Sequence, residues 1–152
     1  MTNETALPDP SDTPPEEPQL PRHDLPKQVI VMRNDLNMRK GKMIAQGSHA
    51  SMMFLVESLL AAARDPAGSF HLDAGAWRWL ASGRMSKICV RVDSEAELLD
   101  VAAKAQDAGL PVHVITDAGL TEFGGVPTRT CAAIGPAAAS RIDPITGHLK
   151  LL

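Results

Sequence analysis

Three cationic side chains stand close together where a helix is predicted to begin. Arg39, Lys40 and Lys42 follow the apolar run of residues 29–32, which is typical of a strand, and open a segment with helical periodicity. The positive end of the helix dipole makes this an unfavourable place for cations unless an anion binds there. Helix N-termini commonly bind phosphate groups. The pattern therefore predicts a protein that handles phosphate-bearing ligands, with nucleic acid high among them.

A polar stripe continues along the same predicted helix. Lys42, Gln46 and His49 have the spacing i, i+4 and i+7, which places them on one face. The neighbouring face carries Met43, Gly47, Ala50 and Phe54 and is expected to dock on a sheet. We expect functional side chains at Lys42 and Gln46. The His49 ring could either contact a ligand or be a satisfied structural side chain.

A carboxylate and a hydroxyl follow a second predicted strand, residues 112–116. Asp117, Gly119 and Thr121 form a polar turn after this apolar run. Binding sites in open α/β sheets form outside the carboxyl ends of the strands, which favours a functional Asp117. Asp-x-Gly is also ordinary turn chemistry, so a purely structural turn stays open. Gly119 is expected to provide a backbone angle or a close approach that other residues do not allow.

Several other kinds of site lack their sequence signals. Residues 38–43 do not have the additional glycines of a P-loop, and no Gly-x-Ser-x-Gly motif is present. The histidines and cysteines lack the spacing of a zinc site. No Ser or Cys has a recognisable activating base, so the residues do not indicate a covalent nucleophile. We therefore expect neither a metal nor another cofactor.

Composition divides the chain into two parts. Residues 1–26 contain seven prolines and carry a net charge of −5, so they are predicted to be a disordered acidic tail. Residues 27–152 are predicted to form one domain, which carries +2 although the whole chain carries −3. No signal peptide or apolar run long enough for a membrane span is present. With Cys89 and Cys131 interpreted as small buried hydrophobic residues, a cytoplasmic protein without a membrane partner is expected.

Periodicity and punctuation predict an α/β fold. Strands are expected at residues 28–33, 87–92, 112–116 and 130–134, and helices at residues 40–63, 73–80 and 94–108. A short helix could follow Pro136, and the last residues could pair as an edge segment. Ser94 and Glu97 form a capping-box pattern at the third helix. Alternating strands and helices indicate a three-layer sandwich with a mostly parallel sheet.

The motifs, taken in their order and spacing, resemble the type 2 peptidyl-tRNA hydrolase family. The matching residues are Arg33, Asp35, Leu36, Met38, Gly41, Lys42, Gln46, His49 and Ala50, then Asp117, Ala118, Gly119 and Thr121, then Thr130, Ile134, Gly135 and Pro136. The resemblance extends from about Lys27 to the C-terminus. Three features depart from the family pattern: Glu122 replaces a common Gln, and residues 64–82 and 123–128 are longer than usual.

The resemblance implies hydrolysis of the ester that joins a peptide, or an N-blocked aminoacyl group, to the 3′ end of tRNA. It also implies a four-stranded mixed sheet with helices on both faces, and a homodimer. The implied catalytic residues are Lys42, Asp117, Gln46, Thr121 and Thr130, and the implied substrate-binding residues are Arg33, Arg39, Lys40, His49 and Gly119. Whether Lys42 or Asp117 transfers the proton stays open. The alternative is a non-catalytic module that binds RNA or protein through the same fold.

Overall fold

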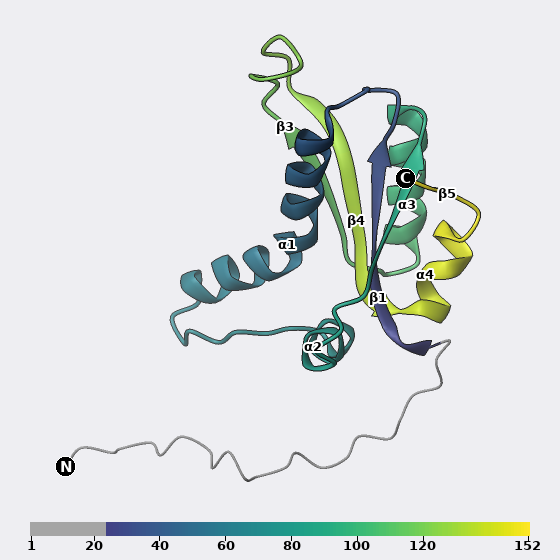
Figure 1. Cartoon of the computed structure of the whole chain (residues 1–152). Helices are drawn as coiled ribbons and strands as arrows, with labels where there is room; N and C mark the ends of the chain where they lie inside the picture. The colour runs from purple at the N-terminus through teal and green to yellow at the C-terminus, as the bar shows by residue number, and fades with distance from the viewer. Residues whose placement is uncertain (1–23) are drawn as a thin grey trace, which may run out of the picture.

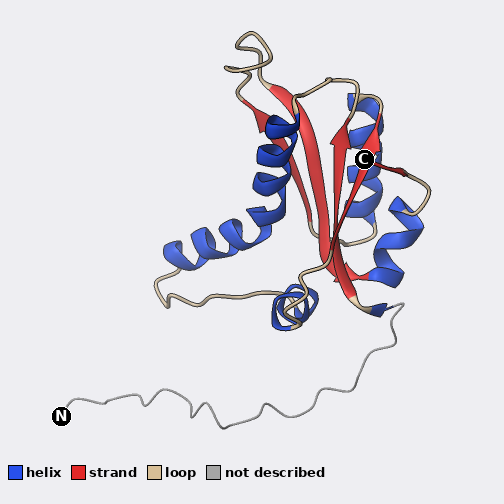
Figure 2. Cartoon of the chain, in the orientation of Figure 1, coloured by secondary structure: helices blue, strands red, loops and turns tan. Residues whose placement is uncertain are grey.

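The computed structural model describes residues 24–152, so most of the predicted disordered tail lies outside the described residues. Figure 1 shows the elements in chain order, and Figure 2 separates helices from strands. They are β1 (Pro26–Arg33), α1 (Lys40–Arg64), α2 (Ala74–Ala81), β2 (Lys87–Val92), α3 (Glu95–Asp107), β3 (Val112–Asp117), β4 (Thr128–Ala138), α4 (Ala139–Thr146) and β5 (Lys150–Leu151). Within this part of the chain, no helix is both long and apolar enough to span a bilayer.

The sheet is mixed, as predicted, but it has five strands and not four. Its order is β3-β4-β1-β2-β5, and the predicted C-terminal edge segment is the fifth strand. The prediction of a mostly parallel sheet was wrong, because only β1 and β2 pair in parallel. The pairs β1–β4, β3–β4 and β2–β5 are all antiparallel.

The connection between β3 and β4 explains the antiparallel pairing. Residues 118–127 contain no helix, and a parallel pair needs a crossover of a dozen or more residues. β4 also runs further than predicted, through Pro136 to Ala138. Its register against β1 shifts between Lys27 and Val29, opposite Pro136. A proline is tolerated at such an irregularity because it has no N–H to donate.

Alternating side chains of β1 supply two cores on the two faces of the sheet. Val29 and Val31 pack with Leu98 of α3 and Ile142 of α4 in one core. Ile30 and Met32 belong to the other core, with Ala50 of α1 and Cys131 and Ala133 of β4. Figure 1 shows α1 and α3 on opposite sides of the sheet. Since successive side chains of a strand point to opposite faces, a strand buried on both faces has a continuous apolar sequence.

The predicted docking face of α1 is confirmed at three of its four positions. Gly47, Ala50 and Phe54 are buried, whereas Met43 is only partly buried. Phe54 then contacts Trp79 of α2 edge-to-face, with the ring centroids 5.9 Å apart. The capping pattern of α3 is also confirmed, because Ser94 Oγ accepts a hydrogen bond from the Glu97 N–H (3.1 Å).

The prediction that both cysteines are buried was correct for Cys131 and wrong for Cys89. Cys131 is buried in β4, between β3 and β1, whereas Cys89 is exposed on β2. The reason is the position of α1, which contacts β3, β4 and β1 and leaves the same face of β2 uncovered. An apolar groove results between α1 and β2.

Candidate functional site

Lys42 and Asp117 form an ion pair between the first turn of α1 and the end of β3. Lys42 Nζ donates to Asp117 Oδ2 over 2.5 Å and also to the Thr121 hydroxyl over 3.3 Å. Both side chains of the ion pair are mostly buried. The structure therefore brings Lys42 together with two predicted catalytic residues, Asp117 and Thr121, that follow it by 75 and 79 positions in the sequence.

Gln46 and Thr130 form a chain of hydrogen bonds that leads from the protein interior to Asp117. The buried Thr130 hydroxyl donates to Gln46 Oε1 over 2.6 Å, and Gln46 Nε2 donates to Asp117 Oδ2 over 2.9 Å. The Gln46 amide is thus held with its NH₂ group toward the carboxylate. Gln46 is 2% exposed and Thr130 is 0% exposed, so both side chains are almost fully buried where they form this chain of hydrogen bonds to Asp117.

Electrostatics keep the Asp117 carboxylate ionised. The hydrogen bond from the Lys42 ammonium, followed by that from the Gly119 N–H, lowers the pKa of Asp117 below its ordinary value. Gln46 adds to the same effect. Oδ2 is occupied by Lys42 and Gln46, whereas Oδ1 accepts only the Gly119 N–H among the hydrogen bonds within residues 24–152. Asp117 can therefore accept a further hydrogen bond from a bound water.

Gly119 forms the turn that shapes this carboxylate site. Its φ is +81°, and a Cβ atom built there would lie 2.2 Å from the carbonyl oxygen of Val126. Both features require glycine, which agrees with the expected close approach. The Gly119 N–H donates to Asp117 Oδ1 over 2.9 Å. The conformation of the turn and the orientation of the carboxylate are therefore coupled.

The three cations at the start of α1 point to different surroundings. Lys42 turns into the ion pair with Asp117, whereas Lys40 is exposed and lines the apolar groove on the other side of α1. The Arg39 side chain is 78% exposed, and its Nε donates to Glu122 Oε1 over 2.7 Å. Glu122 Oε2 also accepts the Arg39 backbone N–H (3.3 Å). A carboxylate of the protein thus already lies at the positive end of α1.

Arg33 lies outside this cluster, in a network of its own. Its guanidinium pairs with Asp35 (2.6 Å) and Glu95 (2.9 Å) and donates to the Arg129 carbonyl (3.0 Å). The hydrogen bond with Arg33 lowers the pKa of the Asp35 carboxyl. The network joins the ends of β1 and β4 to the first turn of α3. Arg33 therefore stabilises the loop that leads into α1.

A cleft of about 380 Å³ opens beside Asp117, between α1 and β3. Its lining includes Gln46, His49 and Met53 from α1 and residues 114–118 from β3 and the turn. His49 is exposed, and its side chain makes no hydrogen bond with other residues in the described part of the chain. This position favours contact with a ligand over the structural alternative for the His49 ring.

The sequence did not reveal every neighbour of the site. The Phe123 ring lies with its centroid 5.8 Å from Lys42 Nζ, close enough for a cation–π contact. Phe123 belongs to an irregular loop, where no periodic pattern indicates which way a side chain points. The buried Cys131 contacts the Gln46 carbonyl (3.4 Å), and burial raises the pKa of its thiol to about 11. Such a thiol is protonated at neutral pH and is not a nucleophile.

Residues that could hold a metal are not gathered here. Within residues 24–152, no three His, Cys, Asp or Glu side chains lie close enough together to bind a metal ion. The polar groups at the site are an ammonium, a carboxylate, two hydroxyls and an amide. Such a set can orient water, stabilise a developing negative charge and donate hydrogen bonds.

Comparison with known proteins gives a uniform result. The family model described as peptidyl-tRNA hydrolase PTH2 matches residues 26–152. A protein named peptidyl-tRNA hydrolase from Methanocaldococcus jannaschii is 46% identical over 126 residues, which cover 83% of this chain and 99% of that protein. Proteins with the same name from Metallosphaera sedula and Thermococcus onnurineus are 42% and 38% identical over 83% of this chain, covering 99% and 97% of their own lengths.

Proposed function

The chain belongs to the peptidyl-tRNA hydrolase PTH2 family, and from this premise we propose that its ester hydrolysis takes place at the Lys42–Asp117 pair. The observation that carries the proposal is the network in which Lys42, Gln46 and Gly119 all donate to one carboxylate beside an open cleft. The substrate is the ester between a peptide, or an N-blocked aminoacyl group, and the 3′ end of tRNA. No observation favours the alternative of a non-catalytic binding module.

Asp117 orients the attacking water in this mechanism. The water oxygen bonds to the carbonyl carbon, the bond from that carbon to the ribose 3′ oxygen breaks, and the proton released by water ends on the 3′ oxygen. A carboxylate whose pKa is below its ordinary value is a weak base. Oδ1 therefore holds and aligns the water by a hydrogen bond, and full deprotonation is not its task.

Lys42 stabilises the negative charge that develops on the carbonyl oxygen. Its ammonium is a compact point charge held in a mostly buried setting, where charge interactions are stronger than in water. The Thr121 hydroxyl is exposed and shares Lys42 Nζ, so it can donate to the ribose or to the oxyanion. An ammonium beside the leaving oxygen also suits Lys42 as the proton donor.

Gln46 and Thr130 act as positioning residues, because both side chains are almost fully buried and hydrogen-bonded to other residues of the site. Gln46 keeps the carboxylate in place, and Thr130 keeps the Gln46 amide in the orientation that donates. Arg33 has a structural role in the proposed mechanism and does not contact the substrate. Its donors are taken by Asp35, Glu95 and the Arg129 carbonyl, so phosphate binding by Arg33 would disrupt these contacts.

The acceptor end of tRNA is proposed to lie against the start of α1. Arg39 and Lys40 are exposed there, and the unpaired N–H groups of a helix N-terminus favour a phosphate. His49 is placed to contact the terminal nucleotide or the peptide within the cleft. Because the substrate comes from translating ribosomes, the proposed activity belongs in the cytoplasm.

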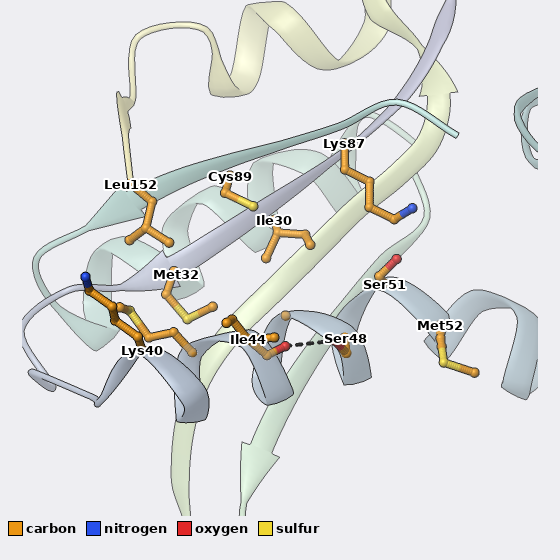
Figure 3. Close-up of a pocket in the computed structure, with 12 residues that line it drawn as sticks. Ile30, Met32, Lys40, Ile44, Ser48, Ser51, Met52, Lys87, Cys89 and Leu152 are labelled. Atoms are coloured by element: carbon orange, nitrogen blue, oxygen red, sulfur yellow. Dashed lines mark hydrogen bonds between the residues drawn. The ribbon is translucent and has the colours of Figure 1, made fainter. Parts of the chain in front are cut away.

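We propose that the protein forms a homodimer and that the apolar groove between α1 and β2 lies in the dimer interface. The groove has a volume of about 610 Å³, and its lining includes Ile44 and Met52 of α1 and Ile30 and Cys89 of the sheet (Figure 3). Exposed leucines at positions 59 and 60 extend the apolar surface along α1. Sedimentation should show a dimer that Ile44→Glu dissociates, while the matched Leu99→Glu substitution on α3 leaves it intact. A monomeric wild-type protein would remove this proposal.

Single-turnover hydrolysis of N-acetyl-aminoacyl-tRNA tests the catalytic site. Lys42→Ala is expected to lower the rate by roughly 10²-fold or more, because one preorganised donor to an oxyanion contributes about that much. Lys104→Ala is the matched control, since Lys104 forms an exposed pair with Asp100 on α3. Equal rates for the two folded variants would place the chemistry elsewhere.

A further inference from the structure

β3 forms one edge of the sheet within residues 24–152, and part of its backbone points away from the neighbouring strand β4. Pro111 and Gly135 form a hydrogen-bonded pair, because the Gly135 N–H donates to the Pro111 carbonyl over 2.8 Å. Such pairs alternate along an antiparallel ladder, so His113 and Ile115 bond to β4. The N–H and C=O groups of Val112 and Val114 therefore face the outer edge.

This edge forms one wall of the cleft that contains Asp117. The lining includes five consecutive residues, 114–118, although successive side chains of a strand point to opposite faces. The Val114 side chain indeed packs in the core beneath α3, whereas Ile115 packs in the core beneath α1. Because the Val114 side chain packs on the far face of the sheet, we infer that Val114 lines the cleft through its backbone. An accessible strand edge thus leads directly to the proposed catalytic carboxylate.

We propose that the edge of β3 binds the last residues of the peptidyl group as an added parallel strand, a step that rests on the proposed function. The ester carbonyl is the C-terminal group of the peptide and must lie at Asp117. β3 also runs toward Asp117, so a peptide along its edge has the same direction as the strand. The outer groups of Val112 and Val114 match about three peptide residues at roughly 3.3 Å per residue.

Backbone recognition suits the chemistry of this substrate. A nascent peptide has no fixed sequence, and pairing with a strand edge uses main-chain hydrogen bonds that every residue except proline provides. Alternate side chains of the bound peptide would point toward α1. Met53 and His49 lie there, and a flexible methionine side chain can adapt to different neighbours.

The first test varies the peptide and leaves the protein unchanged. The value of kcat/KM should rise about tenfold from N-acetyl-aminoacyl-tRNA to a tRNA that carries a four-residue N-acetylated peptide, as expected for about two added hydrogen bonds. N-methylation of a peptide nitrogen that faces β3 should abolish this gain in kcat/KM. N-methylation of the next nitrogen, which faces away from β3, should leave the gain unchanged. A constant kcat/KM along the series, or an equal loss at both nitrogens, would overturn the proposal.

The second test changes the edge of β3. Val114→Pro removes an outward N–H and spares the hydrogen bonds to β4, so the ratio of kcat/KM between the long and short substrates should fall to about one. Val114→Ala keeps the N–H and should keep the ratio. An unchanged ratio in a folded Val114→Pro variant would contradict the proposal, and the N-methylated series decides if that variant does not fold. If the wild-type protein hydrolyses none of these substrates, the proposed function itself is refuted.

Discussion

Replacing Asp117 by Asn tests the centre of the proposed mechanism. The substitution keeps the shape of the side chain and removes the charge that pairs with Lys42. Unit charges 2.5 Å apart attract by about 2 kcal/mol in water and about 7 kcal/mol at an effective dielectric constant of about 20. The two side chains are 13% and 15% exposed, so their surroundings lie between these limits.

We expect Asp117→Asn to lower the single-turnover rate by about 10²- to 10³-fold, which corresponds to about 2.7–4 kcal/mol of lost transition-state stabilisation. The neutral amide can no longer hold both Lys42 and a water as a carboxylate does. Asp100→Asn is the matched control, because it removes the charge from the exposed pair with Lys104. A folded Asp117→Asn variant within about threefold of the wild-type rate would refute the mechanism.

The pH dependence distinguishes a carboxylate that orients water from one that acts as a base. The Lys42 ammonium lowers the pKa of Asp117 below the ordinary aspartate pKa of about 4. The carboxylate therefore stays charged at every pH above about 4 and becomes protonated only at lower pH. We therefore expect no inflection due to Asp117 in kcat/KM between pH 5 and 8. An inflection in that range that disappears in Asp117→Asn would show that Asp117 takes up the proton with a raised pKa.

Four further outcomes are expected. The double substitution Arg39→Ala and Lys40→Ala should reduce the slope of log tRNA affinity against log salt concentration by about one to two units. It should also raise KM more than it lowers kcat, whereas the control Lys104→Ala should change neither the slope nor KM. Glu122→Gln should strengthen tRNA binding by severalfold in a filter-binding assay, because it removes a carboxylate from the start of α1; unchanged affinity would mean that tRNA binds elsewhere. Gly119→Ala should lower the melting temperature and abolish most hydrolysis, since its Cβ would lie 2.2 Å from the Val126 carbonyl oxygen. Removing residues 1–23 should leave hydrolysis within about twofold of the full-length rate, because the family model begins at residue 26; a larger loss would assign the segment a part in activity.

The local elements could be predicted from the sequence because local forces decide them. The Ser94 cap sets the start of α3, and the apolar spacing of Gly47, Ala50 and Phe54 sets the buried face of α1. The same spacing puts Lys42 and Gln46 on one side of the helix. These features depend on neighbours within one or two turns, and such neighbours are read directly from the chain.

The order and direction of the strands depend on contacts that are distant in the sequence. β4 pairs antiparallel with both β3 and β1, so the expectation of a mostly parallel sheet was wrong. The helix-free connection at residues 118–127 was the available signal, because a short connection cannot cross over to a parallel strand. Exposure of Cys89 likewise depends on where α1 lies over the sheet.

The sequence by itself determined which residue types could hydrolyse an ester and that a helix start and a strand end carry them. Only the tertiary structure decided which of these side chains meet. It joins Lys42 and Gln46 to Asp117 and joins Thr130 to Gln46. It also places Lys40 on the other side of α1 and holds Arg33 in pairs with Asp35 and Glu95. The physical reason is that each of these contacts, except that of Arg33 with Asp35, spans at least 62 positions of the chain, so its geometry exists only after the sheet and α1 have packed together.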